Sequence, residues 1–149
     1  MKQGSFNKEI FIKSDVATVH KVVSEVSEHH KVHPLIVKVE RVADVPEGVV
    51  RRYFITDSLL WGPFKFKIRY RADILSITSD SVHTEAYQSP GTYVDNVTRI
   101  IPQENGVVLQ ESVTIKAPNP LFGYTFQQAD IAHTEMLKRI KKFVEGSRN

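Results

Sequence analysis

The alternation of apolar and charged side chains between residues 64 and 74 restricts the fold of this chain more than any other feature. The apolar members are Phe64, Phe66, Ile68, Tyr70, Ala72 and Ile74, and the intervening residues are Lys65, Lys67, Arg69, Arg71 and Asp73. Because successive side chains of a strand point to opposite faces, one face of this strand is buried and the other is solvated. Sheets that are covered on one side only are antiparallel. The pattern therefore predicts an antiparallel sheet with a single covering layer.

The C-terminal segment is predicted to form that covering layer. Its apolar residues recur at helical spacing and form one stripe, which comprises Phe122, Phe126, Ala129, His133, Met136, Leu137, Ile140, Phe143 and Val144. Asn119 suits a helix cap, Pro120 suits the first helical position, and Gly146 suits the end. A helix of about 25 residues would be about 37 Å long, enough to lie across a whole sheet.

Turn signals place the remaining elements in the order strand, two short helices and six strands. Ser14 is predicted to cap the first helix, and a second helical turn is predicted over Ser27–Val32, where Pro34 ends it. The strands are predicted at Phe6–Lys13, Leu35–Val45, Val49–Asp57, Phe64–Ile77, Ser81–Gln88, Tyr93–Ile101 and Val107–Lys116.

Length and composition indicate one domain, which we expect to cover residues 1–149. The chain has no cysteine and a net charge of +3, which excludes thiolate chemistry and is too small a charge for a nucleic-acid-binding surface. No apolar run approaches the roughly 20 residues that cross a bilayer, and the first residues lack the apolar stretch of a secretion signal. We therefore predict a cytoplasmic protein with no nucleic-acid partner and no stable membrane insertion.

This order of elements resembles the helix-grip fold of the START/Bet v 1-like superfamily, also called SRPBCC or polyketide cyclase/dehydrase and lipid-transport proteins. Ile10–Val19 is similar to the first strand and helix start of bacterial polyketide-cyclase-like members, and His33–Glu40 is similar to the segment after their second helix. The resemblance covers nearly the whole chain. It implies an α+β fold in which a seven-stranded curved antiparallel sheet wraps around the long C-terminal helix. Members bind lipids, sterols, polyketides or hormones, and some are enzymes, but no catalytic signature is recognisable here and no catalytic residue is assigned.

The middle of the C-terminal stripe offers a ligand site. His133 lies there beside Ala129 and Ala132, and such small side chains leave room for a cavity to which the imidazole contributes a polar group. The alternative is a core histidine that is hydrogen-bonded to a neighbour. The predicted ligand-binding residues are His133, Tyr70, Phe66, Glu111, Phe126, Ala129, Met136, Tyr53 and Arg51.

Glu111 interrupts the apolar residues on the inward face of the last predicted strand. A buried carboxylate needs a partner, or its pKa rises. Arg51 and Arg52 are adjacent on a strand, so one of them points inward and could pair with Glu111 or bind an acidic ligand group. In the alternative, both arginines lie at the rim of the sheet and reach water. The same two alternatives, pairing inside the sheet or lying at its rim, apply to Asp95 and Arg99, for which the sequence pattern is weaker.

A metal site is a weaker interpretation of the histidines near the second helical turn. Glu25, His29 and His33 would share one face of a continuous helix, and histidines at this spacing bind zinc elsewhere. The predicted helix breaks near Ser27, however, and Pro34 ends it. We predict no metal and no cofactor, and we find no nucleophile elbow or glycine-rich phosphate loop.

Leu59, Leu60 and Trp61 fall at a predicted turn. An exposed apolar turn could act as a lid or make transient contact with a membrane. It could equally fold back onto the sheet.

Three functions follow from these patterns. The first is binding or transport of a small hydrophobic molecule, such as a lipid, an isoprenoid or a polyketide-like aromatic compound, in a cavity between sheet and helix. The second is an aromatase/cyclase-type enzyme in which His133, Glu111 and Tyr70 move protons. The third is a protein-interaction or co-chaperone-like module that uses the basic outer face of the sheet.

Overall fold

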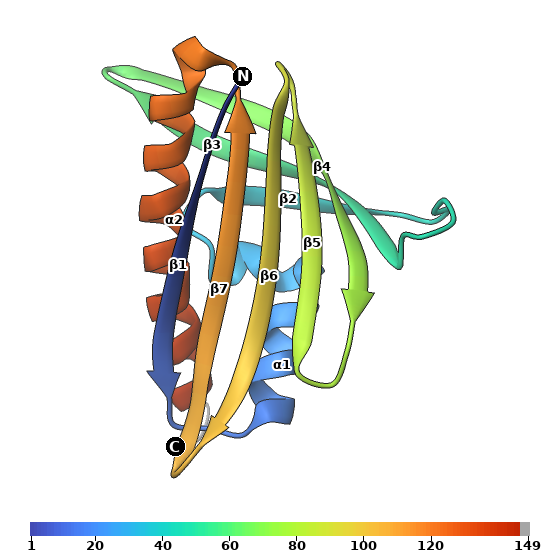
Figure 1. Cartoon of the computed structure of the whole chain (residues 1–149), viewed down its shortest axis with the longest axis vertical. Helices are drawn as coiled ribbons and strands as arrows, with labels where there is room; N and C mark the ends of the chain where they lie inside the picture. The colour runs from blue at the N-terminus through green and yellow to red at the C-terminus, as the bar shows by residue number, and fades with distance from the viewer. Residues whose placement is uncertain (147–149) are drawn as a thin grey trace.

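The computed structural model describes residues 1–146 and shows one antiparallel sheet with helices on one of its faces (Figure 1). The strands are β1 (Lys2–Ile12), β2 (Ile36–Val42), β3 (Arg51–Trp61), β4 (Phe64–Ile77), β5 (Ser81–Gln88), β6 (Thr92–Gln103) and β7 (Gly106–Ala117), and the helices are α1 (Val16–Ser24), the 3₁₀ helix η1 (Val26–Lys31) and α2 (Asn119–Gly146). The seven strands are arranged in the order β1-β7-β6-β5-β4-β3-β2.

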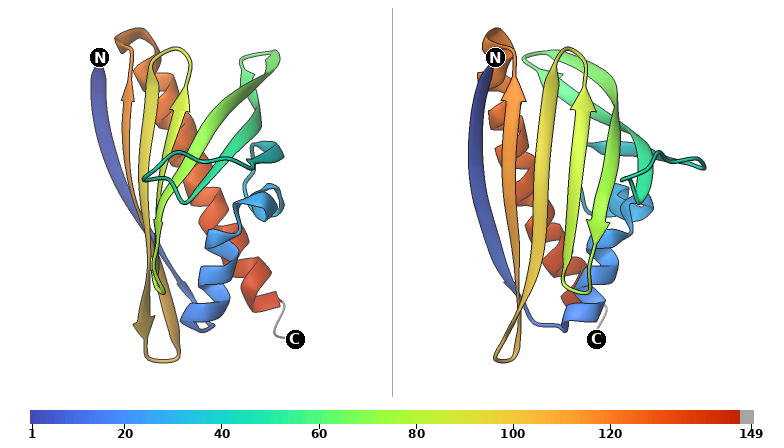
Figure 2. Two further views of the ribbon diagram at one scale, coloured as in Figure 1. Left: turned by 90° about the vertical axis from the view of Figure 1, so that its right-hand side faces the viewer. Right: turned by 45° about the vertical axis from the view of Figure 1, so that its right-hand side comes forward.

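The sheet is curved and encloses α2. Seen from the side, α2 crosses one face of the sheet diagonally, and α1 and η1 lie on that same face, with α1 toward one end of the molecule and η1 near its middle (Figure 2). Residues of α2 contact β1 and β7 directly, while the β3–β4 hairpin curls away from these two strands and around the first turns of the helix (Figure 2). This is the predicted helix-grip fold, with the predicted order of all ten elements.

One end of α2 is fixed to β1 by aromatic packing. The Phe126 ring meets the Phe6 ring edge-on at 5.5 Å and lies 5.4 Å from the Phe122 ring. A Cβ atom at Gly4 would lie 2.8 Å from Cζ of Phe122, so a larger residue there would require the Phe122 ring to move away from the strand.

A larger apolar core joins α1 and the last turns of α2 to the middle of the sheet. Its fully buried members include Ile12, Val19, Tyr53, Ile74, Ile100, Leu109, Ile140 and Val144. The β-branched residues of α1 are poor helix formers, and Val19 and Val23 are buried against this core. Tertiary packing therefore stabilises a helix that its own sequence would not.

Several element ends differ from the prediction. The first strand begins at Lys2, because Lys2 pairs with Ala117 at the far end of β7. The first helix is capped by Asp15, whose carboxylate accepts from the Thr18 amide at 2.7 Å, and the predicted cap at Ser14 is wrong. Asn119 is already inside α2, and the carbonyl of Pro118 accepts the first helical hydrogen bond from Phe122.

The β3–β4 hairpin is longer than predicted. β3 continues past Asp57 to Trp61, which pairs with Phe64 across a tight turn. Leu59, Leu60 and Trp61 therefore belong to a strand, and the predicted apolar turn over these residues is wrong. Gly62 has a φ of 60° in the turn itself, a conformation that favours glycine.

Candidate functional site

A cavity of about 220 Å³ lies between α2 and the concave face of the sheet. It arises because α2 rests on β1 and β7 while the other strands curve away from it. Small side chains, Ala72 and Ala86 on the sheet and Ala129 and Ala132 on α2, widen the gap. The further lining residues are Val23, Val26, His29, His33, Leu35, Ile36, Tyr53, Ile55, Asp57, Leu59, Ile68, Tyr70, Ile74, Val82, Thr84, Gln88, Val94, Asn96, Thr98, Leu109, Glu111, Tyr124, Thr125, Gln128, His133, Met136 and Ile140.

Six of the nine predicted ligand-binding residues line this cavity, namely His133, Tyr70, Glu111, Ala129, Met136 and Tyr53. The other three are held elsewhere. Phe66 points inward but lies opposite Leu59, near the β3–β4 turn. Phe126 packs on Phe6, because the cavity faces a strip of α2 rotated toward Thr125 and Gln128.

Arg51 does not pair with Glu111. It lies on the inward face of β3, as the alternation of that strand requires, but its guanidinium donates to the Ser24 carbonyl at the end of α1, at 3.3 Å. Arg52 points to the outer face and binds Asp73 through two hydrogen bonds of 2.7 and 3.0 Å. The sequence therefore correctly predicts that one arginine points inward, but this arginine donates its hydrogen bond to the end of α1 and not to Glu111.

The partner of Glu111 is His133. Nδ1 of His133 lies 2.6 Å from Oε2 of Glu111, and Nδ2 of Asn96 donates to the same oxygen at 3.0 Å. Burial alone would lower the pKa of His133, but the negative charge of Glu111 and this hydrogen bond raise it. Burial likewise raises the pKa of Glu111, yet the facing imidazole and the Asn96 amide lower it below its ordinary value. The two groups form a buried ion pair at the cavity wall.

Two further histidines lie beside this pair. The ring of His33 is 6.4 Å from that of His133, edge to face. Burial lowers the pKa of His33 to about 3, and the positive charge of His133 adds to this effect, so the His33 ring stays neutral. Its Nδ1 accepts from the Leu35 amide, which leaves the proton on Nε2.

His29 serves the backbone. Its Nε2 lies 2.9 Å from the Val23 carbonyl and 3.2 Å from the Val22 carbonyl, so that nitrogen carries a proton. Burial lowers the pKa of His29. Structural hydrogen bonds thus occupy one ring nitrogen of His29 and one of His33. Of the residues described, only His83, Glu85 and Asp95 bring three metal-ligand atoms within 4.8 Å of one another.

A second polar pair lies on the β3 and β4 walls. Tyr70 donates its phenol proton to Oδ1 of Asp57 at 3.3 Å, and Asp57 is only 7% exposed. Burial raises the pKa of Asp57 to about 6, and the Tyr70 hydrogen bond opposes this rise only partly. Burial and the Asp57 carboxyl together raise the pKa of Tyr70 well above its ordinary value.

Sequence reasoning missed Asp57 and Asn96, although a signal for both is present. Asp57 interrupts the inward run Tyr53, Ile55 and Leu59 in the same way that Glu111 interrupts its own strand. Asn96 lies between Val94 and Thr98 on the inward face of β6. His33 also lines the cavity, because η1 folds against β2.

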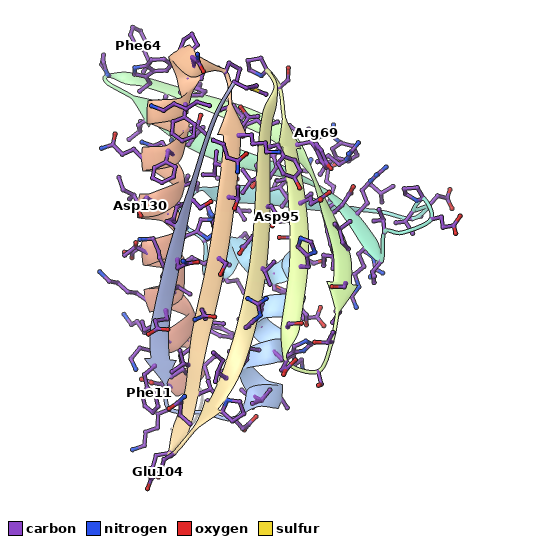
Figure 3. All side chains as sticks on the ribbon, viewed as in Figure 1. Phe11, Phe64, Arg69, Asp95, Glu104 and Asp130 are labelled. Carbon is purple, nitrogen blue, oxygen red and sulfur yellow. The ribbon has the colours of Figure 1, made fainter. Side chains whose placement is uncertain are left out.

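The outer face of the sheet holds the remaining charged candidates. Asp95 lies there, on the face turned to the viewer in Figure 3, and binds His83 at 2.6 Å. Arg99 pairs across the strands with Ser81 and Gln110 on this face. Neither Asp95 nor Arg99 lines the cavity. Of the charged residues for which the sequence left an inward position open, Glu111 is the one that belongs to the site.

No known protein-family profile matches the sequence, and no curated protein matches it either. Solved structures do match. The di-domain ARO/CYC StfQ from the steffimycin biosynthetic pathway has a TM-score of 0.79 at 14% identity, over 98% of this chain and 52% of that one. A protein of Thermus thermophilus has a TM-score of 0.79 at 12% identity, over 98% of this chain and 100% of that one.

A point mutant of norcoclaurine synthase from Thalictrum flavum, in complex with a transition-state analogue, has a TM-score of 0.74 at 15% identity, over 99% of this chain and 98% of that one. The chain spans about half the length of the di-domain protein and nearly all of the other two. The likeness establishes the fold alone: this chain has the same helix-grip fold as these structures. Within residues 1–146, no helix is both long and apolar enough to cross a membrane.

Proposed function

We propose that this protein binds a small, largely apolar ligand in the cavity beneath α2. The observation that carries the proposal is an apolar chamber with two separate polar pairs on its walls, Glu111–His133 and Asp57–Tyr70. Apolar walls with a few placed polar groups are typical of small-molecule sites. Asp57 in particular accepts only one hydrogen bond, so a wall that binds nothing would leave a buried carboxyl group poorly compensated.

A cavity-filling variant tests this proposal. Ala132 is 3% exposed and lines the cavity, whereas the preceding residue, Ile131, is 55% exposed and does not line it. We expect Ala132→Phe to weaken binding of an apolar fluorescent probe such as 1-N-phenylnaphthylamine at least tenfold, and Ile131→Phe to leave it unchanged. Native mass spectrometry of the purified protein should also detect co-purifying small molecules. A purified protein that carries no co-purifying small molecule and binds no apolar probe would refute the proposal.

A second candidate function is catalysis of the aromatase/cyclase type, without a cofactor. It requires several titratable groups in one cavity, and His133, Glu111, Tyr70 and Asp57 all line it. The protonated His133 can donate to a carbonyl oxygen, and the Asp57 carboxylate, with its pKa near 6, can accept a proton at neutral pH.

This candidate is tested with a poly-β-ketone thioester mimic. Cyclised product should appear with the wild type and fall at least a hundredfold in His133→Gln, while binding of the neutral probe persists. Equal product with the wild type and in buffer would exclude the enzyme and leave the binding function intact.

The basic outer face gives less support to the third function, a protein-interaction module. Arg69 stacks on Phe54 at 4.2 Å and pairs with Glu40, while Arg71 stacks on Tyr87 at 4.4 Å. Both side chains therefore have partners within the sheet itself.

Ligand exchange against a membrane is also part of the proposal. The β3–β4 hairpin projects beyond the sheet, with Phe64 at its tip (Figure 3), and Leu60, Trp61 and Phe64 are 63%, 55% and 73% exposed. Tyr124, which lines the cavity, stacks on Trp61 at 4.8 Å. Apolar side chains beside exposed lysines suit the interface of an anionic bilayer.

A further inference from the structure

The cavity wall contains one acidic side chain that the protein leaves without a positive partner. Within the described part of the chain, three carboxyl groups are buried, those of Asp57, Asp73 and Glu111, at 7%, 3% and 3% exposure. Asp73 binds Arg52 through both oxygens, and Glu111 binds His133 and Asn96. Asp57 accepts a single hydrogen bond, from the neutral phenol of Tyr70.

The orientation of Asp57 leaves half of its carboxyl group available. The Tyr70 phenol occupies Oδ1, and no described residue donates to Oδ2. Asp57 and Tyr70 both line the cavity, and the cross-strand neighbour of Asp57 is Ile68, which lines it as well. The carboxyl group therefore lies at the wall of the chamber with one oxygen free to bind a ligand whose charge would compensate its own.

We propose that Asp57 and Tyr70 form a subsite for the protonated amine of an otherwise apolar ligand. The inference rests on the proposed binding function and specifies its ligand class. An alkylammonium has three donors and a compact charge, so it can bind Oδ2 of Asp57 directly. The oriented phenol of Tyr70 holds the carboxylate in place from the other side.

The remaining charged and titratable groups around the chamber do not provide this charge. Glu111 and His133 neutralise each other on β7 and α2, and burial lowers the pKa of both His29 and His33 near η1. The phenol of Tyr124 on α2 donates to the Leu60 carbonyl at 3.1 Å. The only group that shifts the pKa of Asp57, apart from its burial, is Tyr70.

The subsite predicts how amine affinity depends on pH. The carboxyl of Asp57 has a pKa of about 6 in the free protein, whereas an alkylammonium stays protonated to about pH 10. Asp57 is mostly protonated at pH 5 and mostly ionised at pH 7. Affinity for the amine should therefore rise about tenfold from pH 5 to pH 7, and affinity for a neutral analogue should not.

The experiment compares matched probes by titration calorimetry on the whole chain. 2-(2-Naphthyl)ethylamine and 2-(2-naphthyl)ethanol share one apolar body and differ in charge. We expect the amine to bind at least tenfold more tightly than the alcohol at pH 7. Asp57→Asn should remove this preference and leave alcohol affinity unchanged, whereas Glu104→Gln, at the exposed β6–β7 turn at the far end of the molecule (Figure 3), should alter neither.

Each result has one meaning. Equal binding of amine and alcohol, or an amine preference that persists in Asp57→Asn, would overturn the subsite but leave the binding cavity in place. Failure of both probes to bind at millimolar concentration would count against the proposed function itself. Circular dichroism of each variant establishes that it is folded, so that a lost preference reports on Asp57.

Discussion

The three buried carboxyl groups in the described part of the chain differ in their partners, and so in their charge. Asp73 is held by arginine on the outer face, Glu111 by histidine in the cavity, and Asp57 by a phenol alone. Burial by itself favours the neutral acid and raises the pKa of Asp57 despite its phenol partner, whereas the imidazole and amide partners of Glu111 outweigh burial and lower its pKa. The carboxyl group of Glu111 therefore stays ionised, while that of Asp57 has a pKa of about 6, close to neutral pH.

The lone carboxyl of Asp57 should lower stability at neutral pH. Its pKa of about 6 in the folded protein lies above the ordinary value of 3.8. The folded state therefore loses stability as pH rises between these two values, by no more than about 3 kcal/mol in total. We expect Asp57→Asn, which keeps an acceptor for Tyr70, to raise the free energy of unfolding by about 1 to 2 kcal/mol at pH 7.5. The gain should vanish near pH 3.5, where both states carry a neutral acid. Urea denaturation at the two pH values measures this, and a loss of stability at pH 7.5 would contradict it.

The Glu111–His133 pair should have the opposite effect. His133 contributes stability below pH 6.5, which is lost as pH rises through its raised pKa, and Glu111 contributes above pH 4.5, which is lost as pH falls through its lowered pKa. Glu111→Gln should therefore destabilise the protein by about 2 to 3 kcal/mol near pH 6 and by less at pH 9. The His133 imidazole, followed by NMR, should then titrate at lower pH. An unchanged His133 titration would show that the pair is not coupled.

At the scale of elements, the β3–β4 hairpin combines two roles. Leu59 faces the cavity from β3, whereas Leu60 and Trp61 at the end of the same strand are exposed. A hydrogen bond from Tyr124 to the Leu60 carbonyl ties the hairpin to α2. Movement of this tip would therefore change access to the space beneath the helix.

Membrane contact of the hairpin can be observed directly, because Trp61 is the chain's single tryptophan. Vesicles with about 30% phosphatidylserine should shift its emission to the blue, and neutral vesicles should do so less. Lys65→Glu with Lys67→Glu should weaken binding at least fivefold, since neither lysine forms an ion pair with any residue of the described structure. Ile131→Ala, an exposed apolar change on α2, is the matched control. Unchanged Trp61 emission at millimolar anionic lipid would refute the contact.

At the scale of the whole molecule, the half-buried His33 should make the fold sensitive to acid. The unfolded chain protonates His33 below pH 6.5, but the folded protein does so only near pH 3. Its pKa is lowered on folding, so stability falls as pH decreases through that window, by at most about 1.4 kcal/mol per pH unit.

His33→Asn tests this sensitivity, because asparagine can still accept from the Leu35 amide. The variant should lose less stability than the wild type between pH 7 and pH 4.5. His30→Asn, in the exposed neighbouring turn, should follow the wild type. Chemical denaturation at four pH values in this range gives the slopes, and parallel slopes for His33→Asn and wild type would contradict the prediction.

The sequence alone determined the fold class, because period-two alternation in β4 and a helical stripe in α2 are local patterns that leave few architectures open. It also indicated His133 and Glu111, since each interrupts an apolar pattern. Their mutual contact, at 22 residues of separation, depends on how α2 is placed over β7. Only the tertiary structure decided that placement, the inward but helix-bound position of Arg51, and the missing counter-charge of Asp57. These depend on the rotation of α2 and on the curvature of the sheet, and both arise from packing between distant segments that no local periodicity encodes.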